Sequence, residues 1–140
     1  MARNRFLVFL LSFAVAGCSL GSDPSGSLEV SIGDSPVALP AQGAADVTLT
    51  LANTGGSPVT VDLCSERIAA GLQEQIDGVW VEAGSNSCGG SARESVVISQ
   101  GSSLVTSYAL TRPGTFRLRI PFIGTNGFAE VTTPSFQATR

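Results

Sequence analysis

The feature that most restricts the fold of this chain is an alternation of apolar and polar residues with a period of two. It begins at Leu28, where Leu28, Val30 and Ile32 alternate with polar or small residues. Such alternation places the apolar side chains on one face of a β-strand. We expect further strands over residues 47–51, 59–63, 72–76, 79–82, 95–99, 104–110, 115–122 and 128–132. No long stretch has a helical period, so the chain is predicted to be all-β.

Turn-forming residues separate the predicted strands. Asn53–Pro58 and Gly124–Gly127 are typical loops, and Asp77-Gly78 predicts a two-residue hairpin between Ile76 and Val79. Residues 68–71 fit either a strand or the start of a helical turn, and residues 83–93 predict a loop. Short strands at this spacing favour an antiparallel β-sandwich of about seven to nine strands over residues 28–140.

The first 18 residues have the layout of a secretory signal. Arg3 and Arg5 precede an apolar run, Phe6–Val15, which is shorter than the roughly 20 residues that a membrane-spanning helix needs. Val15–Cys18, with the sequence Val-Ala-Gly-Cys, resembles the bacterial lipoprotein signal. The resemblance implies cleavage before Cys18 and acyl chains on its sulfur.

Three segments follow from this resemblance. Residues 1–17 are the expected signal peptide, and residues 18–27 are the lipidated cysteine with a flexible tether rich in Gly, Ser and Pro. Residues 28–140 are the expected folded domain. The implied location is the cell envelope, on the outer membrane facing the periplasm in a Gram-negative host.

Charge argues against several partners. After position 17 the chain keeps six arginines and eleven acidic residues, which gives a formal charge of −5. It has no cluster of basic residues, which binding to nucleic acid or to an anionic membrane surface requires. We therefore expect no nucleic acid partner, and the lipid on Cys18 as the only membrane contact.

The composition also argues against catalysis. The chain has no histidine and no lysine, so neither a Ser-His-Asp site nor a Ser-Lys site can form. The carboxylates near Cys64 and the predicted hairpin lack the dense alternation of a Ca²⁺ loop. These carboxylates are Asp62, Glu66, Glu74, Asp77 and Glu82. We expect no enzyme, no cofactor, no metal ion and no small-molecule substrate.

Cys64 and Cys88 are the cysteines that remain after Cys18. In an oxidising compartment such a pair persists as a disulfide. A redox or metal-binding pair is the competing interpretation, but the spacing is not CxxC. We predict a structural disulfide between the two.

Three stretches resemble known domains. The Asn-Thr-Gly turn and following Pro-led strand in Leu49–Val59 resemble the early strand pair of bacterial immunoglobulin-like domains, and Ile98–Leu104 with Arg112–Leu118 resembles their later half. Over residues 45–123 the order is also similar to the bacterial intracellular proteinase inhibitor family. The resemblance implies an immunoglobulin-like fold. Phe116 stands where those domains usually have a tyrosine whose hydroxyl bonds back to the chain.

Five side chains are candidates for a partner surface: Trp80, Arg117, Arg119, Thr125 and Asn126. For the two arginines a solvated outer face is the competing interpretation, and for Trp80 it is core packing. Two functions remain: a non-enzymatic lipoprotein that binds an envelope protein or has a structural role, and a proteinase inhibitor that presents residues 124–127 or 84–93 to a protease.

Overall fold

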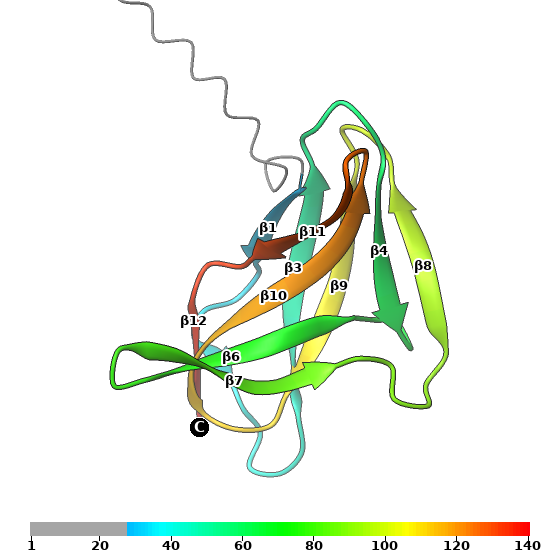
Figure 1. Ribbon diagram of the computed structural model, residues 1–140. Helices are drawn as coiled ribbons and strands as arrows, with labels where there is room; N and C mark the ends of the chain where they lie inside the picture. Colours follow the sequence, from blue (N-terminus) through cyan, green and yellow to red (C-terminus); the bar gives the residue numbers. More distant parts are fainter. Residues whose placement is uncertain (1–27) are drawn as a thin grey trace, which may run out of the picture.

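Twelve β-strands make up the regular structure of residues 28–140, the part of the chain that the computed structural model describes (Figure 1). They are β1 (Leu28–Ile32), β2 (Val37–Ala38), β3 (Ala45–Asn53), β4 (Val59–Cys64), β5 (Arg67–Ile68), β6 (Ala70–Ile76), β7 (Val79–Asn86), β8 (Arg93–Ile98), β9 (Ser103–Leu110), β10 (Gly114–Gly124), β11 (Gly127–Thr132) and β12 (Phe136–Thr139). Within this range there is no helix able to span a membrane. The predicted signal peptide and tether lie outside the described residues.

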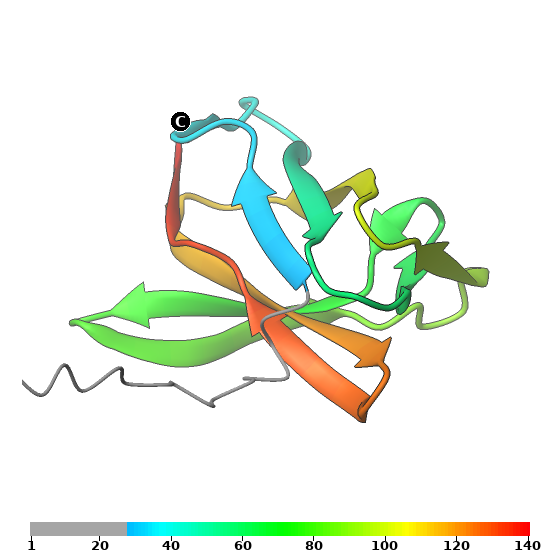
Figure 2. The same ribbon diagram turned by 90° about the horizontal axis from the view of Figure 1, so that it is seen from above.

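The strands form a curled sheet with eight strands on its main path, in the order β1-β3-β9-β5-β4-β10-β12-β2. The short β5 joins the layer β1-β3-β9 to the layer that contains β8, β4, β10 and β11. The two layers face each other across the core (Figures 1 and 2). The predicted all-β sandwich is confirmed. Its pairs are antiparallel except for two short parallel ones, β5 with β9 and β12 with β2.

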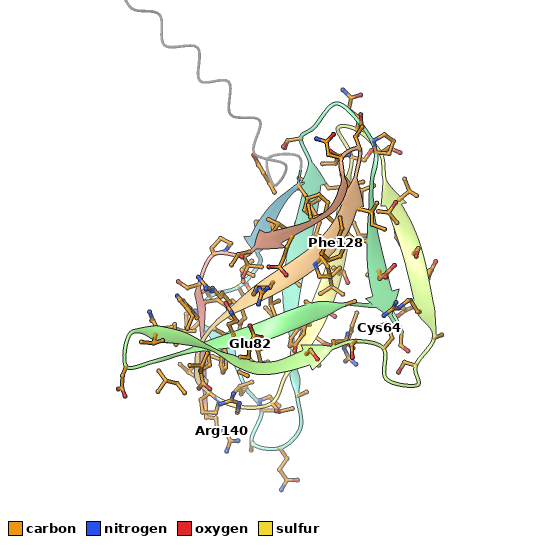
Figure 3. The ribbon with its side chains drawn as sticks, viewed as in Figure 1. Cys64, Glu82, Phe128 and Arg140 are labelled. Atoms are coloured by element: carbon orange, nitrogen blue, oxygen red, sulfur yellow. A yellow bond between two sulfur atoms is a disulfide. The ribbon has the colours of Figure 1, made fainter. Side chains whose placement is uncertain are left out.

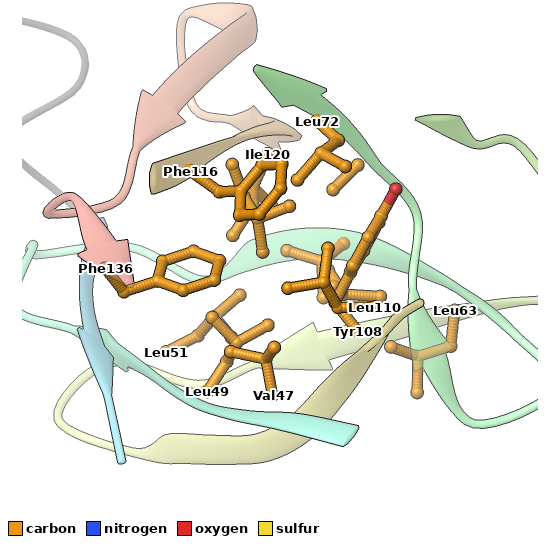
Figure 4. Packing of buried hydrophobic residues seen from close by; sticks show 14 of the residues in the cluster. Val47, Leu49, Leu51, Leu63, Leu72, Tyr108, Leu110, Phe116, Ile120 and Phe136 are labelled. Carbon is orange, nitrogen blue, oxygen red and sulfur yellow. The ribbon is translucent and has the colours of Figure 1, made fainter. Parts of the chain in front are cut away.

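The core follows from the alternation. In β10, Phe116, Leu118, Ile120 and Phe122 are all buried, and β3 contributes a facing row (Figure 4). Phe116 lies 6.2 Å from Phe136 between ring centroids and is completely buried. A hydroxyl at this position would need a buried hydrogen-bond partner, so phenylalanine suits this core.

Two short strands, β2 and β12, were not predicted. In β12 the side chains of Phe136 and Ala138 are buried, and the strand pairs with both β10 and β2. Each segment is too short for a periodic pattern to be recognised in the sequence. Their pairing with distant strands, rather than local propensity, makes them strands.

One long hairpin with a corner in the middle occupies residues 59–98. Its outgoing arm is β4 followed by β6, and its returning arm is β7 followed by β8, which pair with β6 and β4 respectively. Residues 68–71 therefore belong to strands. The predicted loop over residues 83–93 was wrong in its first part, because β7 continues to Asn86. The predicted Asp77-Gly78 turn is confirmed, with φ of 51° and 80°.

A buried asparagine connects the loops at one end of the sandwich. Asn53 is 1% exposed, and its Nδ2 donates to the carbonyl oxygens of Ser57 at 2.8 Å and Ile98 at 2.9 Å. Its Oδ1 accepts from the amide of Gly55 at 3.0 Å, and its own amide donates to the carbonyl of Ser102 at 3.0 Å. Asn53 thereby holds the β3–β4 and β8–β9 loops together.

Replacing Asn53 tests this role. We expect Asn53→Ala to lower the free energy of unfolding by about 1 to 3 kcal/mol, because buried backbone groups lose their partners. Urea denaturation measures the change. Gln137→Ala, on an exposed position of β12, is the control and should change stability by less than about 0.5 kcal/mol. Equal effects of the two substitutions would contradict the assigned role.

Candidate functional site

The hairpin formed by β6 and β7 projects beyond the core (Figure 1). β6 pairs with β10 only between Gly71 and Glu74, so the residues after Glu74 have no support from β10. Leu72 is the last side chain of the hairpin that is buried in the main core. The turn at Asp77-Gly78 therefore lies past the edge of the sandwich.

One face of this hairpin carries an apolar cluster. Ile76 is 50% exposed, Val79 is 62% exposed and Val81 is 37% exposed. Ile76 pairs with Val79 across the strands, and Val81 lies on the same face two residues further along β7. This face continues the core-facing side of β6 but extends past the core. These three side chains are called the hairpin cluster below.

The opposite face of the hairpin is polar and internally bonded. The guanidinium of Arg117 lies 4.3 Å from the centroid of the Trp80 ring, and its Nε donates to Oε1 of Gln73 at 2.8 Å. Such stacking of arginine on tryptophan stabilises both side chains. Trp80 is half-buried whereas Val79 and Val81 are exposed, so its main role here is packing.

Arg119 is neutralised within the fold. Its Nη1 donates to Glu82 at 2.7 Å and its Nε to Glu130 at 2.7 Å. The hydrogen bond from Gln73, followed by that from Arg119, lowers the pKa of Glu82 below its ordinary value. The hydrogen bond to Glu130, followed by that to Glu82, raises the pKa of Arg119. Arg119 thus already binds two carboxylates, those of Glu82 and Glu130. Glu82 is labelled in Figure 3.

The structure divides the predicted partner surface into two parts. Trp80, Arg117 and Arg119 lie together on the polar face of β7, β6 and β10. Thr125 and Asn126 form the turn between β10 and β11. Thr125 is eight residues after Arg117 along the chain, or roughly 26 Å at about 3.3 Å per residue.

The carboxylates considered for Ca²⁺ are dispersed. Glu74 forms an ion pair with Arg112, whereas Glu82 points to the other face of the hairpin. Asp62 accepts a hydrogen bond from Ser95 at 2.7 Å. Within residues 28–140, no three His, Cys, Asp or Glu side chains are placed to hold a metal ion.

Sequence reasoning missed the hairpin cluster. The alternation of Leu72, Glu74 and Ile76 was recognised, but it predicts burial for every apolar member of the strand. Only the length of β6 relative to its pairing with β10 shows that Ile76 and its neighbours extend past the core. The Asp77-Gly78 turn predicted the hairpin, but not its extension past the core.

No family model matches the chain, and no curated protein matches it in sequence. Among solved structures, the chain is similar to the Northeast Structural Genomics Consortium target SoR45, with a TM-score of 0.55 and 13% identity over 79% of this chain and 84% of that chain. That similarity shows the fold alone. A β-glucosidase from Listeria innocua in complex with gluconolactone gives a TM-score of 0.38 and 16% identity, covering 81% of this chain but 16% of the enzyme, which is too distant to support an argument.

Proposed function

We propose that this protein is a lipid-anchored, non-enzymatic lipoprotein of the cell envelope whose immunoglobulin-like domain binds another envelope protein through the hairpin cluster. The observation that carries the binding role is the exposure of Ile76, Val79 and Val81 on one face of a projecting hairpin. The anchor rests on the Val15–Cys18 signal and on the start of the folded domain only ten positions after Cys18.

The chemistry of the hairpin suits a protein partner. Neighbouring exposed aliphatic side chains favour burial against another surface. Among the described strands β7 pairs only with β6, so its other edge has free backbone groups to which a partner strand could add. The hairpin cluster would supply apolar contact, and the unpaired edge of β7 would set the direction of the partner strand.

The inhibitor hypothesis has less support from the geometry. An inhibitory loop must offer an extended segment to the protease cleft. Gly124 pairs with Gly127, so that loop is a two-residue hairpin turn, and residues 84–86 lie within β7. The rest of the second loop is tied to β4 by the bond between Cys64 and Cys88.

Site-specific photo-cross-linking tests the partner. A photoreactive amino acid at position 79 should give one adduct of defined mass in intact cells, because Val79 is the most exposed member of the hairpin cluster. The same amino acid at position 105, where Val105 is 67% exposed on β9, is the control and should give none. Adding Val81→Glu should reduce the adduct yield at position 79. Indistinguishable patterns at 79 and 105 would refute a specific site on the hairpin.

A further inference from the structure

A second exposed apolar group lies on the opposite end of the same layer. Strand register aligns one residue each from β8, β4, β10 and β11 across the outer face of the sheet: Val97, Thr60, Ile123 and Phe128. Val97 is 60% exposed, Ile123 57% and Phe128 76%. Of these three, Phe128 is labelled in Figure 3. Phe128 has the highest exposure among the large apolar side chains of residues 28–140.

This row borders a shallow pocket of about 240 Å³, lined by Thr60, Asp62, Arg93, Pro121, Phe122, Ile123 and Phe128. Its two charged members lie along the strands away from the row and pair with each other at 3.8 Å. The part next to Phe128 is apolar. The ring of Phe128 is thus exposed to water, although burying such a ring is favourable.

The loops beside this row contain no charged residue. The chain is uncharged over residues 47–61, 95–111 and 120–129, which include the β3–β4, β8–β9 and β10–β11 loops. Asn53 bonds the first two loops together, and the pairing of Ile123 with Thr60 brings the third beside them. These three loops and the row of Val97, Thr60, Ile123 and Phe128 are called the uncharged end below.

The chain enters the domain at this end. Leu28, the first described residue, pairs with Asn53 (Figure 1). Cys18 lies ten positions earlier, so the connecting backbone spans at most roughly 35 Å when fully extended. A lipid on Cys18 would therefore tether the domain to the membrane through this end.

We propose that the uncharged end rests on the lipid bilayer, with Phe128 and Ile123 in the interface between headgroups and acyl chains. The proposal depends on the lipid anchor put forward above. The sequence predicted the lipid as the only membrane contact because it has no cluster of basic residues, but an apolar contact requires none. Aromatic rings are favoured at the bilayer interface, and the three loops hold no acidic group that anionic lipid would repel.

The bilayer fits this end better than a protein partner does, for two reasons. The short connection restricts what can approach it, and the three loops offer no charge for a partner to recognise. In this orientation the hairpin lies away from the membrane. Arg117, which stacks on Trp80, lies six residues before Ile123 on β10, which is a separation of roughly 20 Å. The hairpin cluster stays open to an envelope protein.

The single tryptophan of the chain allows a direct test. The full lipidated protein is reconstituted into zwitterionic phosphatidylcholine vesicles whose acyl chains carry bromine, which quenches tryptophan on contact. Wild-type protein reports on Trp80, at the hairpin. The double variant Trp80→Phe with Phe128→Trp reports on the uncharged end, and both substitutions keep an aromatic ring. Circular dichroism checks the fold, and flotation with the vesicles checks the anchor.

We expect the tryptophan at position 128 to lose most of its emission, equally at low and high salt, while Trp80 is not quenched. If the double variant does not fold, Phe128→Trp alone should lose the emission of one of its two tryptophans. If the tryptophan at position 128 is not quenched in protein that floats with the vesicles, this proposal is overturned and the anchor stands. A protein partner at this end would give that result. Equal quenching at both positions also overturns it. Failure to float refutes the anchor itself, and with it the proposal.

Discussion

Cys18→Ser is expected either to release the protein from the membrane fraction of its host as a soluble form or to leave the precursor uncleaved. Each acyl chain contributes about 0.8 kcal/mol per buried CH₂, so two or three chains hold a small domain firmly. A few exposed side chains at the uncharged end supply far less. Fractionation followed by mass spectrometry of the mature N-terminus measures both location and cleavage.

Ser19→Ala is the matched control, because it changes the neighbouring residue and keeps the lipidated sulfur. It should remain in the membrane fraction with acyl chains on Cys18. A Cys18→Ser protein that is cleaved after Gly17 and still fractionates with membranes would show that the Val15–Cys18 segment is not a lipoprotein signal. The proposals that depend on the tether would then fail as well.

The double substitution Cys64→Ala with Cys88→Ala is expected to lower the free energy of unfolding by about 2 to 4 kcal/mol. The two sulfurs are bonded, with Cα atoms 4.8 Å apart and a sequence separation of 24. The side chains are 4% and 8% exposed and pack with Ala69 in a cluster separate from the main core. Alanine keeps these positions apolar, so the loss reports the cross-link rather than a buried hydroxyl.

The disulfide closes the corner of the long hairpin. Ser65, Glu66 and Cys88 all have positive φ there, a conformation that is uncommon for residues other than glycine. We expect the far-ultraviolet signature of β structure to survive the substitution, because β6 still pairs with β10. Amide exchange should quicken most in β6 and β7, which lie beyond the corner.

Urea denaturation of the wild-type domain, with and without reductant, gives the matched comparison for this variant. Mass spectrometry of the unreduced protein should recover the peptides that contain Cys64 and Cys88 as one species. Two free thiols in protein isolated from the envelope would refute the structural role of these cysteines.

Much of the fold could be predicted from local patterns. A strand that is buried on one face needs apolar residues at every second position, so Val47, Leu49 and Leu51 identified β3 without any knowledge of its neighbours. Asp77-Gly78 identified its hairpin for a similar reason, because the turn needs positive φ at both positions. The disulfide followed from two remaining cysteines and an expected oxidising compartment.

The candidate surfaces were harder to predict from the sequence. The sequence marked Trp80 and Thr125 together as partner residues, yet β10 places them at opposite ends of one layer. It also predicted burial for Ile76 and did not single out Phe128. The exposure of Ile76 and Phe128 cannot be predicted from alternation. Alternation indicates which face of the strand a side chain lies on, but not whether another strand covers that face.

The sequence by itself determined the local quantities: the strand rhythm, the turns, the absence of histidine and lysine, the disulfide pair and the lipoprotein-like segment. Only the tertiary structure decided where β6 extends past β10, that β12 completes the core, and that three uncharged loops meet where the chain enters the domain. These features depend on register between strands distant in sequence. Register is set by the sum of many weak contacts across the sheet, which no single stretch of the chain contains.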